Sequence, residues 1–481
     1  MTALQQNLTV LLPELILVVA GMVLLLAGAM QKNDRAMRTL SFLAVVAMGV
    51  AAYFVVMPLT GETRAFGGAF TADSFARFAK ILILLGSSMT IVLSQGLFER
   101  ENIARFEFPV LVIFATVGML LMVSASSFLA LYMGLELHSL AFYVLAAFNR
   151  ESARSSEAGL KYFVLSALSS GILLYGISLI YGFTGTTGFA QVASVVKESG
   201  APIGLIFGLV FLIAGLAFKV AAVPFHMWTP DVYEGSPTPI TAFFSMAPKV
   251  AAMALFLRAV IVPFPHAVHE WQQVIITASV LSMILGSVAA IGQANIKRLM
   301  AYSTIGHMGY TLLGLAANSM AGVEGVLIYL TIYVVTNAGI FACILAMKRN
   351  GQMVETISDL SGLARTQPRL ALAFAIFLFS LAGVPPLAGF FGKFYVFLAA
   401  IEAHLIWPAV IGVLASVIGC YYYLRIVKVM YFDEPAPAFD RDLGISLGAT
   451  MAGASIFSVF FIVGAAPLLA LAEYSAKALV P

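Results

Sequence analysis

Long apolar runs alternate with short polar segments over the whole chain. Cutting the sequence at the polar segments leaves about fourteen stretches of roughly 20 residues, the length that a helix needs to cross about 30 Å of hydrocarbon. The stretches begin near residues 10, 39, 79, 108, 127, 158, 203, 241, 272, 299, 323, 370, 405 and 443. The pattern therefore predicts an all-α polytopic membrane protein with about fourteen transmembrane helices, called predicted spans 1 to 14 below.

The composition agrees with this fold class and excludes others. Of the 481 residues, 61% are hydrophobic and 10% are charged, whereas soluble domains carry about 25% charged residues. The mean hydropathy is +0.99. The net charge of +3 comes with no basic stripe, so no nucleic-acid partner is expected. The residues before the first span lack the basic region of a cleavable signal peptide, so we expect that span to be retained.

The basic residues between the spans are distributed unequally. If the N-terminus faces outward, sixteen lysines and arginines lie on the cytoplasmic side: Lys32, Arg35, Arg38, Arg100, Arg105, Arg150, Arg154, Lys297, Arg298, Lys348, Arg349, Arg365, Arg369, Arg425, Lys428 and Arg441. Six lie on the opposite side: Arg64, Arg77, Lys80, Lys197, Arg258 and Lys477. Because cytoplasmic loops carry an excess of basic residues, both termini are predicted on the periplasmic side.

Four of the 26 basic residues remain, and each falls within a predicted span: Lys161, Lys219, Lys249 and Lys393. Glu136 is the one carboxylate at the middle of a predicted span, while the other acids lie in loops or near span ends, Glu14 among them. A lysine at the centre of a bilayer helix costs about 2.5 to 3.5 kcal/mol, so such residues usually serve a function. The four lysines and Glu136 are therefore candidate site residues.

Two of the candidate residues have a purely structural alternative. Lys161 follows Glu157 by four residues, which also fits an ordinary ion pair at a helix end. His307 lies on a helical stripe with Ser303 and Tyr310. A neutral histidine on such a stripe can relay protons near neutral pH, or it can serve as a structural hydrogen-bond partner. Both residues stay candidates for a proton relay.

One further histidine and two cysteines bear on other kinds of site. His138 follows Glu136 by two residues and so points away from it, which leaves a packing role open. Cys343 and Cys420 both fall within spans and form neither a CxxC motif nor a Cys/His cluster. We therefore expect no disulfide, metal site or bound cofactor in this chain.

Prolines interrupt two of the predicted spans beside their lysines. Pro224 follows Lys219 by five residues, and Pro385 and Pro386 precede Lys393. Proline lacks the amide that continues a helix, so spans 7 and 12 are predicted to be broken. The two lysines lie 174 residues apart, since 393 minus 219 is 174, and they are expected to be counterparts.

The two broken spans predict an internal repeat. The second follows the first by five spans, so residues 107–262 (spans 4 to 8) and 272–430 (spans 9 to 13) are expected to form two repeats. Residues 1–106 then hold spans 1 to 3, and residues 431–481 hold span 14. An odd number of spans per repeat inverts the second repeat relative to the first. Inverted repeats with broken helices are typical of ion carriers with a site at the bilayer midplane.

These features predict a mechanism based on proton transfer. A carboxylate close to a buried lysine favours its protonated form. A change in the distance between Glu136 and Lys219 would therefore decide whether Lys219 holds a proton. Lys219, Lys249, His307 and Lys393, bridged by water, could then pass protons along the midplane.

Six motifs closely resemble the antiporter-like subunits of respiratory complex I (NADH-quinone oxidoreductase), a family related to the Mrp antiporters. They are GLELHSL, EAGLKYF, FKVAAVPFHMWTPDVYEGSPTP, APKVAA, IKRLMAYSTIGHMGY and GVPPLAGFFGKF, and together they extend from span 4 to span 12. The resemblance implies that Glu136 and Lys219 act as a pair, Lys249 connects the two repeats, and Lys393 lies on the outlet side. It also implies a proton-translocating enzyme subunit without a redox centre, with FMN, iron–sulfur clusters and quinone on other subunits.

Smaller features separate the branches of this family. The VYEGSPTP loop and Lys393 are similar to the N-type subunit, whereas the M-type has a glutamate at that position and the L-type carries a lateral helix after span 14. The resemblance implies that the chain lies in a bacterial inner membrane beside subunits M and K and the lateral helix of subunit L.

Two related assemblies remain as alternatives, a multisubunit Na+/H+ antiporter and a plastid or cyanobacterial ferredoxin–plastoquinone oxidoreductase. A purely structural anchor would tolerate buried lysines poorly. A carrier for organic solutes would need recognition groups that the sequence does not contain.

Overall fold

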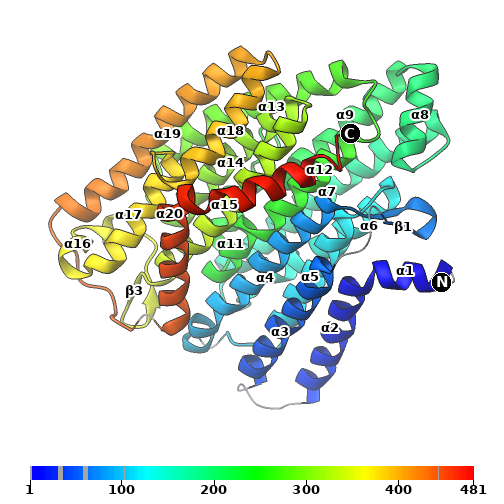
Figure 1. The fold of residues 1–481 in the computed structure, drawn as a ribbon. Coiled ribbons are helices and arrows are strands. Elements are labelled where there is room, and N and C mark those ends of the chain that lie inside the picture. Colours follow the sequence, from blue (N-terminus) through cyan, green and yellow to red (C-terminus); the bar gives the residue numbers. More distant parts are fainter. Residues whose placement is uncertain (1–2, 31–35, 58–62, 102, 443, 481) are drawn as a thin grey trace.

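The computed structural model describes residues 3–30, 36–57, 63–101, 103–442 and 444–480, and these residues form a bundle of tilted helices (Figure 1). Lys32 and Arg35, which were assigned to the cytoplasmic side, lie outside the described residues. The described strands are confined to two short hairpins. The all-α prediction is therefore confirmed.

Four helices and one hairpin form the N-terminal part of the bundle. The helices are α1 (Ala3–Val10), α2 (Leu12–Met30), α3 (Ala36–Val56) and α4 (Ser74–Arg100). The hairpin consists of β1 (Thr63–Ala65), η1 (Phe66–Gly68) and the antiparallel β2 (Phe70–Ala72). Figure 1 shows α2 and α3 side by side at one edge of the molecule, where they pack on α5 and α4. Helix α4 joins this part to the helices that carry candidate residues, because it packs on α12.

The next eight helices lie between Glu107 and Ile261. They are α5 (Glu107–Val123), α6 (Phe128–Ala146), α7 (Ala153–Thr184), α8 (Phe189–Ser199), α9 (Ile203–Val220), α10 (Trp228–Gly235), α11 (Thr238–Ser245) and α12 (Ala247–Ile261). Helix α5 packs on α6, and α7 packs on α9.

The remaining elements complete the chain. They are α13 (Val268–Ile291), α14 (Ile296–Ala316), α15 (Met320–Leu345), β3 (Lys348–Arg349), β4 (Gln352–Met353), η2 (Ile357–Leu360), α16 (Leu363–Thr366), α17 (Pro368–Ala382), α18 (Ala388–Glu402), α19 (Ile406–Phe432) and α20 (Ile445–Ala476). Helix α20 contains Pro467 and packs on α15, and its last part runs across the bundle toward the end of the molecule where α9 is labelled (Figure 1).

The structure supports a protein with many membrane crossings. Within the described residues, eleven helices are long and apolar enough to cross a membrane if α11 and α12 are counted together as Thr238–Ile261, and two further apolar helices, α5 and α17, are shorter. Each of the fourteen predicted spans begins close to an observed helix. The polytopic class is therefore confirmed, while the number of about fourteen crossings stays a prediction.

Both predicted interruptions are present in the structure. Helix α9 ends at Val220, and Ala221 adopts a left-handed conformation with φ of 66°. Helix α17 ends at Ala382, and Gly383 has φ of 88°. New helices begin only at Trp228 and Ala388. Because the chain leaves the helix at both points, the last carbonyls of α9 and α17 are free to bind side chains.

A third interruption was not predicted. Predicted span 8 is divided into α11 and α12 at Met246, whose φ and ψ are −109° and −94°. The local cause is Pro248, which has no amide to donate to the carbonyl of Phe244. The proline of the sequence APKVAA marks this interruption in the same way as Pro224 and Pro386 mark the other two. Lys249 therefore lies in the first turn of a new helix rather than in the middle of a continuous one.

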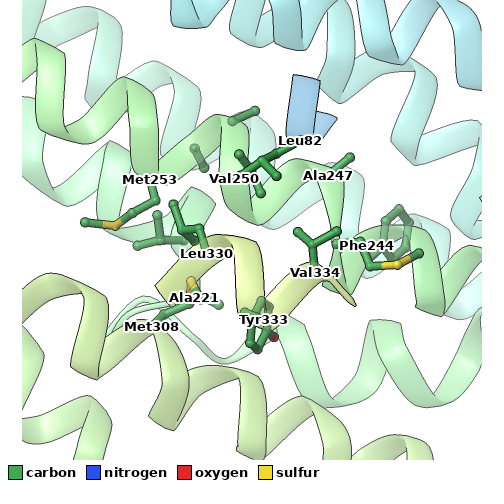
Figure 2. Close-up of a cluster of buried hydrophobic side chains, with 14 of the residues drawn as sticks. Leu82, Ala221, Phe244, Ala247, Val250, Met253, Met308, Leu330, Tyr333 and Val334 are labelled. Carbon is green, nitrogen blue, oxygen red and sulfur yellow. The ribbon is translucent and has the colours of Figure 1, made fainter. Parts of the chain in front are cut away.

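The core surrounds this third interruption. Every residue of α12 is buried. Figure 2 shows Met308 of α14 and Leu330 of α15 near Ala221 at the end of α9, with Val250 of α12 in the same cluster and Phe244 of α11 farther away beside Val334. Apolar side chains from several helices thus lie around the break in α9. Any charge placed there is shielded from water.

Two buried ion pairs correct the sequence-based assignment of charges. Lys80 and Arg258 were assigned to loops on the outer side, and Glu14 was placed near a span end. In the structure Lys80 of α4 pairs with Glu14 of α2 at 2.6 Å, and both side chains are buried. Arg258 of α12 pairs with Asp73, the N-cap of α4, at 2.8 Å. The partners are distant in sequence, so only tertiary packing brings them together.

Candidate functional site

Lys219 lies in the last turn of α9 and binds two serine hydroxyls. It is 6% exposed, and its Nζ donates to Ser139 Oγ of α6 at 3.0 Å and to Ser166 Oγ of α7 at 2.8 Å. The hydroxyl of Tyr143 also donates to Ser166 Oγ, at 2.8 Å. The three hydroxyl-bearing residues were not singled out from the sequence. Serines are common on packed membrane helices, so no local signal marked them.

Glu136 does not contact Lys219 directly. It lies one turn before Ser139 on α6, is half-buried, and its Oε1 accepts no hydrogen bond within the described part of the chain. No ion pair joins Glu136 to Lys219 in this structure. His138 is buried with its ring edge-on to Phe142 at a centroid distance of 5.1 Å, and its Nδ1 has no hydrogen-bond partner among the described residues. Glu136 thus shares α6 with Ser139, which binds Lys219, but Glu136 itself does not contact the lysine.

Lys249 binds the broken end of α9. Its Nζ donates to the carbonyl of Val220, the last residue of α9, over a long 3.4 Å, and lies 5.0 Å from the centroid of the Trp228 ring. Only 1% of Lys249 is exposed. The indole N–H of Trp228 donates to the carbonyl of Phe218 at 3.0 Å. Two carbonyls of the last turn of α9 are therefore satisfied by side chains, and the ammonium lies at the negative end of the helix dipole.

Lys393 binds the broken end of α17 in a similar way. Its Nζ donates to the carbonyl of Ala382, the last residue of α17, at 2.9 Å and to Ser416 Oγ of α19 at 2.8 Å. It lies 5.1 Å from the centroid of the Tyr310 ring. A groove of about 400 Å³ between α18 and α19 reaches this lysine.

The contacts of the lysines differ from the expected pairing of Lys219 with Lys393. Lys219 precedes the break in α9, whereas Lys393 follows the break after α17. Lys393 and Lys249 each donate to the last carbonyl of an interrupted helix, which Lys219 does not. Lys393 shares a serine-hydroxyl contact with Lys219, and all three ammoniums lie over an aromatic ring.

His307 forms the centre of a buried cluster of hydroxyl groups. Its Nδ1 lies 2.5 Å from the hydroxyl of Tyr329, and its Nε2 lies 3.1 Å from the hydroxyl of Tyr423. Tyr423 in turn contacts Ser303 Oγ at 2.5 Å. A cavity of about 20 Å³ borders His307 and Tyr333, which is enough for one water molecule. Both ring nitrogens thus have a partner that can exchange a proton.

Lys161 lies apart from these buried groups. Its side chain is 43% exposed and pairs with Glu157 and Asp231, each at 2.8 Å. These residues line a cavity of about 180 Å³ at the surface, together with Arg154 and Glu234. The pair with Glu157 is the structural alternative expected from the spacing of four residues. The structure does not bring Lys161 into contact with Lys219, Lys249 or Lys393.

A second charged cluster extends from this cavity into the protein. Lys297, assigned to a loop from the sequence, is buried and pairs with Glu355 at 2.5 Å. Glu355 also pairs with Arg154 at 3.0 Å and accepts a hydrogen bond from Asn295 at 3.0 Å. Burial by itself would raise the pKa of Glu355, but the charges of Lys297 and Arg154 hold that pKa below its ordinary value. The cluster connects α7, the start of α14 and the loop after β4.

The described residues offer no metal-binding cluster. No group of three or more His, Cys, Asp or Glu side chains gathers within this part of the chain. Cys343 is buried, and the Cys420 thiol lies 3.5 Å from the carbonyl of Ala382. The side chains that line the site, those of lysine, histidine, tyrosine and serine, can exchange protons with one another or with water.

Comparisons with known proteins agree on one family. A family model described as "NADH:quinone oxidoreductase/Mrp antiporter, TM" matches residues 125–419. The chain is 57% identical to NADH-quinone oxidoreductase subunit N of Parvibaculum lavamentivorans over 471 residues, 98% of this chain and 97% of that protein.

Two solved structures have the same fold. A chain of respiratory complex I from Thermus thermophilus matches with a TM-score of 0.82 at 32% identity, covering 96% of this chain and 99% of that chain. A chain of the Mrp complex from a Dietzia species matches with a TM-score of 0.85, covering 100% and 98%. Its identity is 24%, so this likeness shows the fold alone.

Proposed function

Because the chain belongs to the NADH-quinone oxidoreductase subunit N family, we propose that it is a membrane-arm subunit that translocates protons in a proton-pumping NADH:quinone oxidoreductase. Electron transfer takes place in other subunits, which carry FMN, iron–sulfur clusters and quinone. The chain itself supplies the proton path. The match to the Mrp complex concerns the fold, whereas three curated relatives at 54–57% identity are NADH-quinone oxidoreductase subunits N.

One observation carries this proposal. Lys219, Lys249 and Lys393 are at least 92% buried, and within the described part of the chain each binds hydroxyl or carbonyl oxygens without a carboxylate. A buried ion without a counter-ion costs several kcal/mol. A lysine kept in such a place solely for stability would carry a partner, as Lys80 and Lys297 do. The three lysines are therefore suited to binding and releasing a proton.

The contacts suggest the order of the relay. Glu136 lies one turn from Ser139, which binds Lys219. Lys219 is followed by Val220, whose carbonyl binds Lys249. His307 and its tyrosines then lead toward Lys393, since Tyr310 is on the same helix as His307 and lies under the Lys393 ammonium. Water between these groups would complete the path, and a charge on Glu136 would favour a proton on Lys219.

Lys161 fits the entrance of the first half of this path. It lies in the polar surface cavity with Glu157 and Asp231, where water and protons can reach it. In this proposal Lys161 collects protons at the cytoplasmic side instead of relaying them inside the membrane. Its distance from the buried lysines supports this separation of roles.

The two interruptions support two inverted repeats in residues 107–262 and 272–430. Each left-handed residue at the end of a broken helix, Ala221 or Gly383, is followed three positions later by a proline, Pro224 or Pro386. A site between two such breaks is how ion carriers bind ions at the midplane. We also propose subunits M and K and the lateral helix of subunit L as neighbours, and a bacterial inner membrane with both termini on the periplasmic side.

The experiment replaces Lys219 or Glu136 by alanine in the intact enzyme. NADH-driven acidification of inverted membrane vesicles, followed with a pH-sensitive dye, should be lost in both variants. Electron transfer from NADH to ferricyanide, which depends on the peripheral subunits, should stay normal if the enzyme has assembled. Lys197→Ala, a change at an exposed lysine of α8, is the matched control. Undiminished acidification in both Lys219→Ala and Glu136→Ala would refute the proposal.

A further inference from the structure

Trp228 is the first residue of α10, directly beyond the break in α9, and packs closely on three sides. It is 3% exposed. Its ring stacks on Tyr162 with a centroid distance of 4.6 Å and an angle of 12°, and on Phe218 at 5.5 Å. Its indole N–H binds the carbonyl of Phe218. The plane of the ring is therefore fixed relative to the end of α9.

The ammonium of Lys249 lies over this fixed ring, 5.0 Å from its centroid. Among the described residues its one hydrogen bond is to the carbonyl of Val220, and this bond is 3.4 Å long. A cation over the face of tryptophan is attracted by the negative potential of the ring, and the attraction is strongest where water is excluded.

A second site in the chain has the same construction. Lys393 lies 5.1 Å from the centroid of Tyr310 and binds the last carbonyl of α17. At both interruptions, an aromatic face and a terminal carbonyl hold one ammonium. The recurrence argues against a chance contact between a bulky ring and a long side chain.

We propose that Trp228 is a positioning residue that holds the ammonium of Lys249 at the broken end of α9, and that proton transfer through Lys249 depends on the negative face of its ring. The inference rests on the proposed proton-relay function of Lys249. It adds a residue that carries no proton itself but sets where the proton is held.

The first test compares substitutions in the assembled enzyme. Trp228→Leu removes the ring and should lower the initial rate of NADH-driven acidification, per assembled complex, about tenfold. Trp228→Phe keeps an aromatic face and should restore the larger part of that rate. Trp271→Leu is the control, because Trp271 is fully buried and its indole N–H also binds a main-chain carbonyl, that of Phe264, at 3.2 Å. No lysine or arginine of the described chain lies over Trp271, so this variant should lower only the amount of assembled enzyme. Equal rates in Trp228→Leu and Trp271→Leu would overturn the inference.

The second test works even if Trp228→Leu does not assemble. Tryptophans with one to four ring fluorines, inserted at position 228 by nonsense suppression, keep the shape and the indole N–H but weaken the negative face step by step. The acidification rate should fall with each added fluorine, and the same series at position 271 should show no trend. A flat response at position 228 would refute the dependence on the ring face.

The Lys249→Ala variant separates failure of this inference from failure of the proposed function. If Lys249→Ala leaves acidification intact, the relay proposal fails at that lysine. If Lys249→Ala abolishes acidification and fluorination at position 228 has no effect, only the role of Trp228 is wrong.

Discussion

Replacing Glu355 by glutamine should destabilise the protein through a lysine 58 positions away, since 355 minus 297 is 58. The Lys297 side chain is 3% exposed and that of Glu355 is 17% exposed, so the pair at 2.5 Å is shielded from solvent. Removing one partner of a buried pair costs about 3 to 5 kcal/mol. Lys297 keeps a hydrogen bond to the carbonyl of Ser236 at 3.0 Å, which places the loss at the lower end, about 3 kcal/mol.

The expected change in the unfolding temperature follows from the size of the chain. An unfolding entropy of about 2.1 cal/mol/K per residue amounts to about 1 kcal/mol/K for this length, so the midpoint should fall by about 3 °C. Differential scanning fluorimetry in detergent resolves this shift. Glu99→Gln is the control, because it breaks the exposed pair with Arg38, whose side chains are 39% and 70% exposed. Exposed pairs contribute about 0 to 1 kcal/mol, so its midpoint should change by less than about 1 °C. Equal shifts in the two variants would refute this reasoning.

The same substitution predicts a dependence on pH. The pKa of Glu355 is lower in the folded protein than its ordinary value of 4.5. The folded state therefore binds this proton less readily than the unfolded state, and the stabilisation is fully present above pH 4.5. It is lost as the pH falls through the folded-state pKa. The midpoints of the wild type and Glu355→Gln should thus converge below pH 4.5, and a constant difference down to pH 3 would contradict the assignment.

Three further substitutions test the surroundings of the buried lysines. Ser166→Ala removes an acceptor of Lys219 and should slow NADH-driven acidification several-fold, while Ser166→Thr restores the hydroxyl and most of the rate. Gly383→Ala places a methyl group 3.1 Å from Lys393 Cδ at a φ of 88°, so it should lower stability by about 1 to 3 kcal/mol and slow proton uptake; a wild-type midpoint and rate would contradict this. Ala221→Gly relieves a left-handed φ of 66° and should raise the unfolding midpoint slightly, by up to about 1 kcal/mol in free energy, whereas a lowered midpoint would show that the alanine is not strained.

Short-range patterns identified much of the fold and the candidate site. The bilayer requires about 20 apolar residues per crossing, so each span and each lysine within a span could be recognised locally. Proline removes an amide wherever it occurs, so the breaks at Pro224 and Pro386 were predictable as well. The break at Met246 carried the same signal in Pro248, and it was missed because the run from Thr241 to Ile261 is otherwise continuous and apolar.

Partners distant in sequence could not be predicted in this way. Lys80, Arg258 and Lys297 were assigned to loops because they lie near span ends, yet each is buried against an acid on another element. Counting charges locates a residue along the membrane normal but does not reveal what lies beside it. The serines around Lys219 were invisible for a related reason, because hydroxyl groups are frequent on membrane helices.

The sequence by itself determined that the protein is helical, that it lies in a membrane, and that Lys219, Lys249 and Lys393 lie in apolar spans. These properties follow from the cost of transferring each segment into hydrocarbon, which depends on neighbouring residues alone. Only the tertiary structure decided what each ammonium touches: two serines, the open end of α9 under Trp228, and the open end of α17 over Tyr310. Those contacts depend on how separate helices pack, and packing joins residues that no local pattern links.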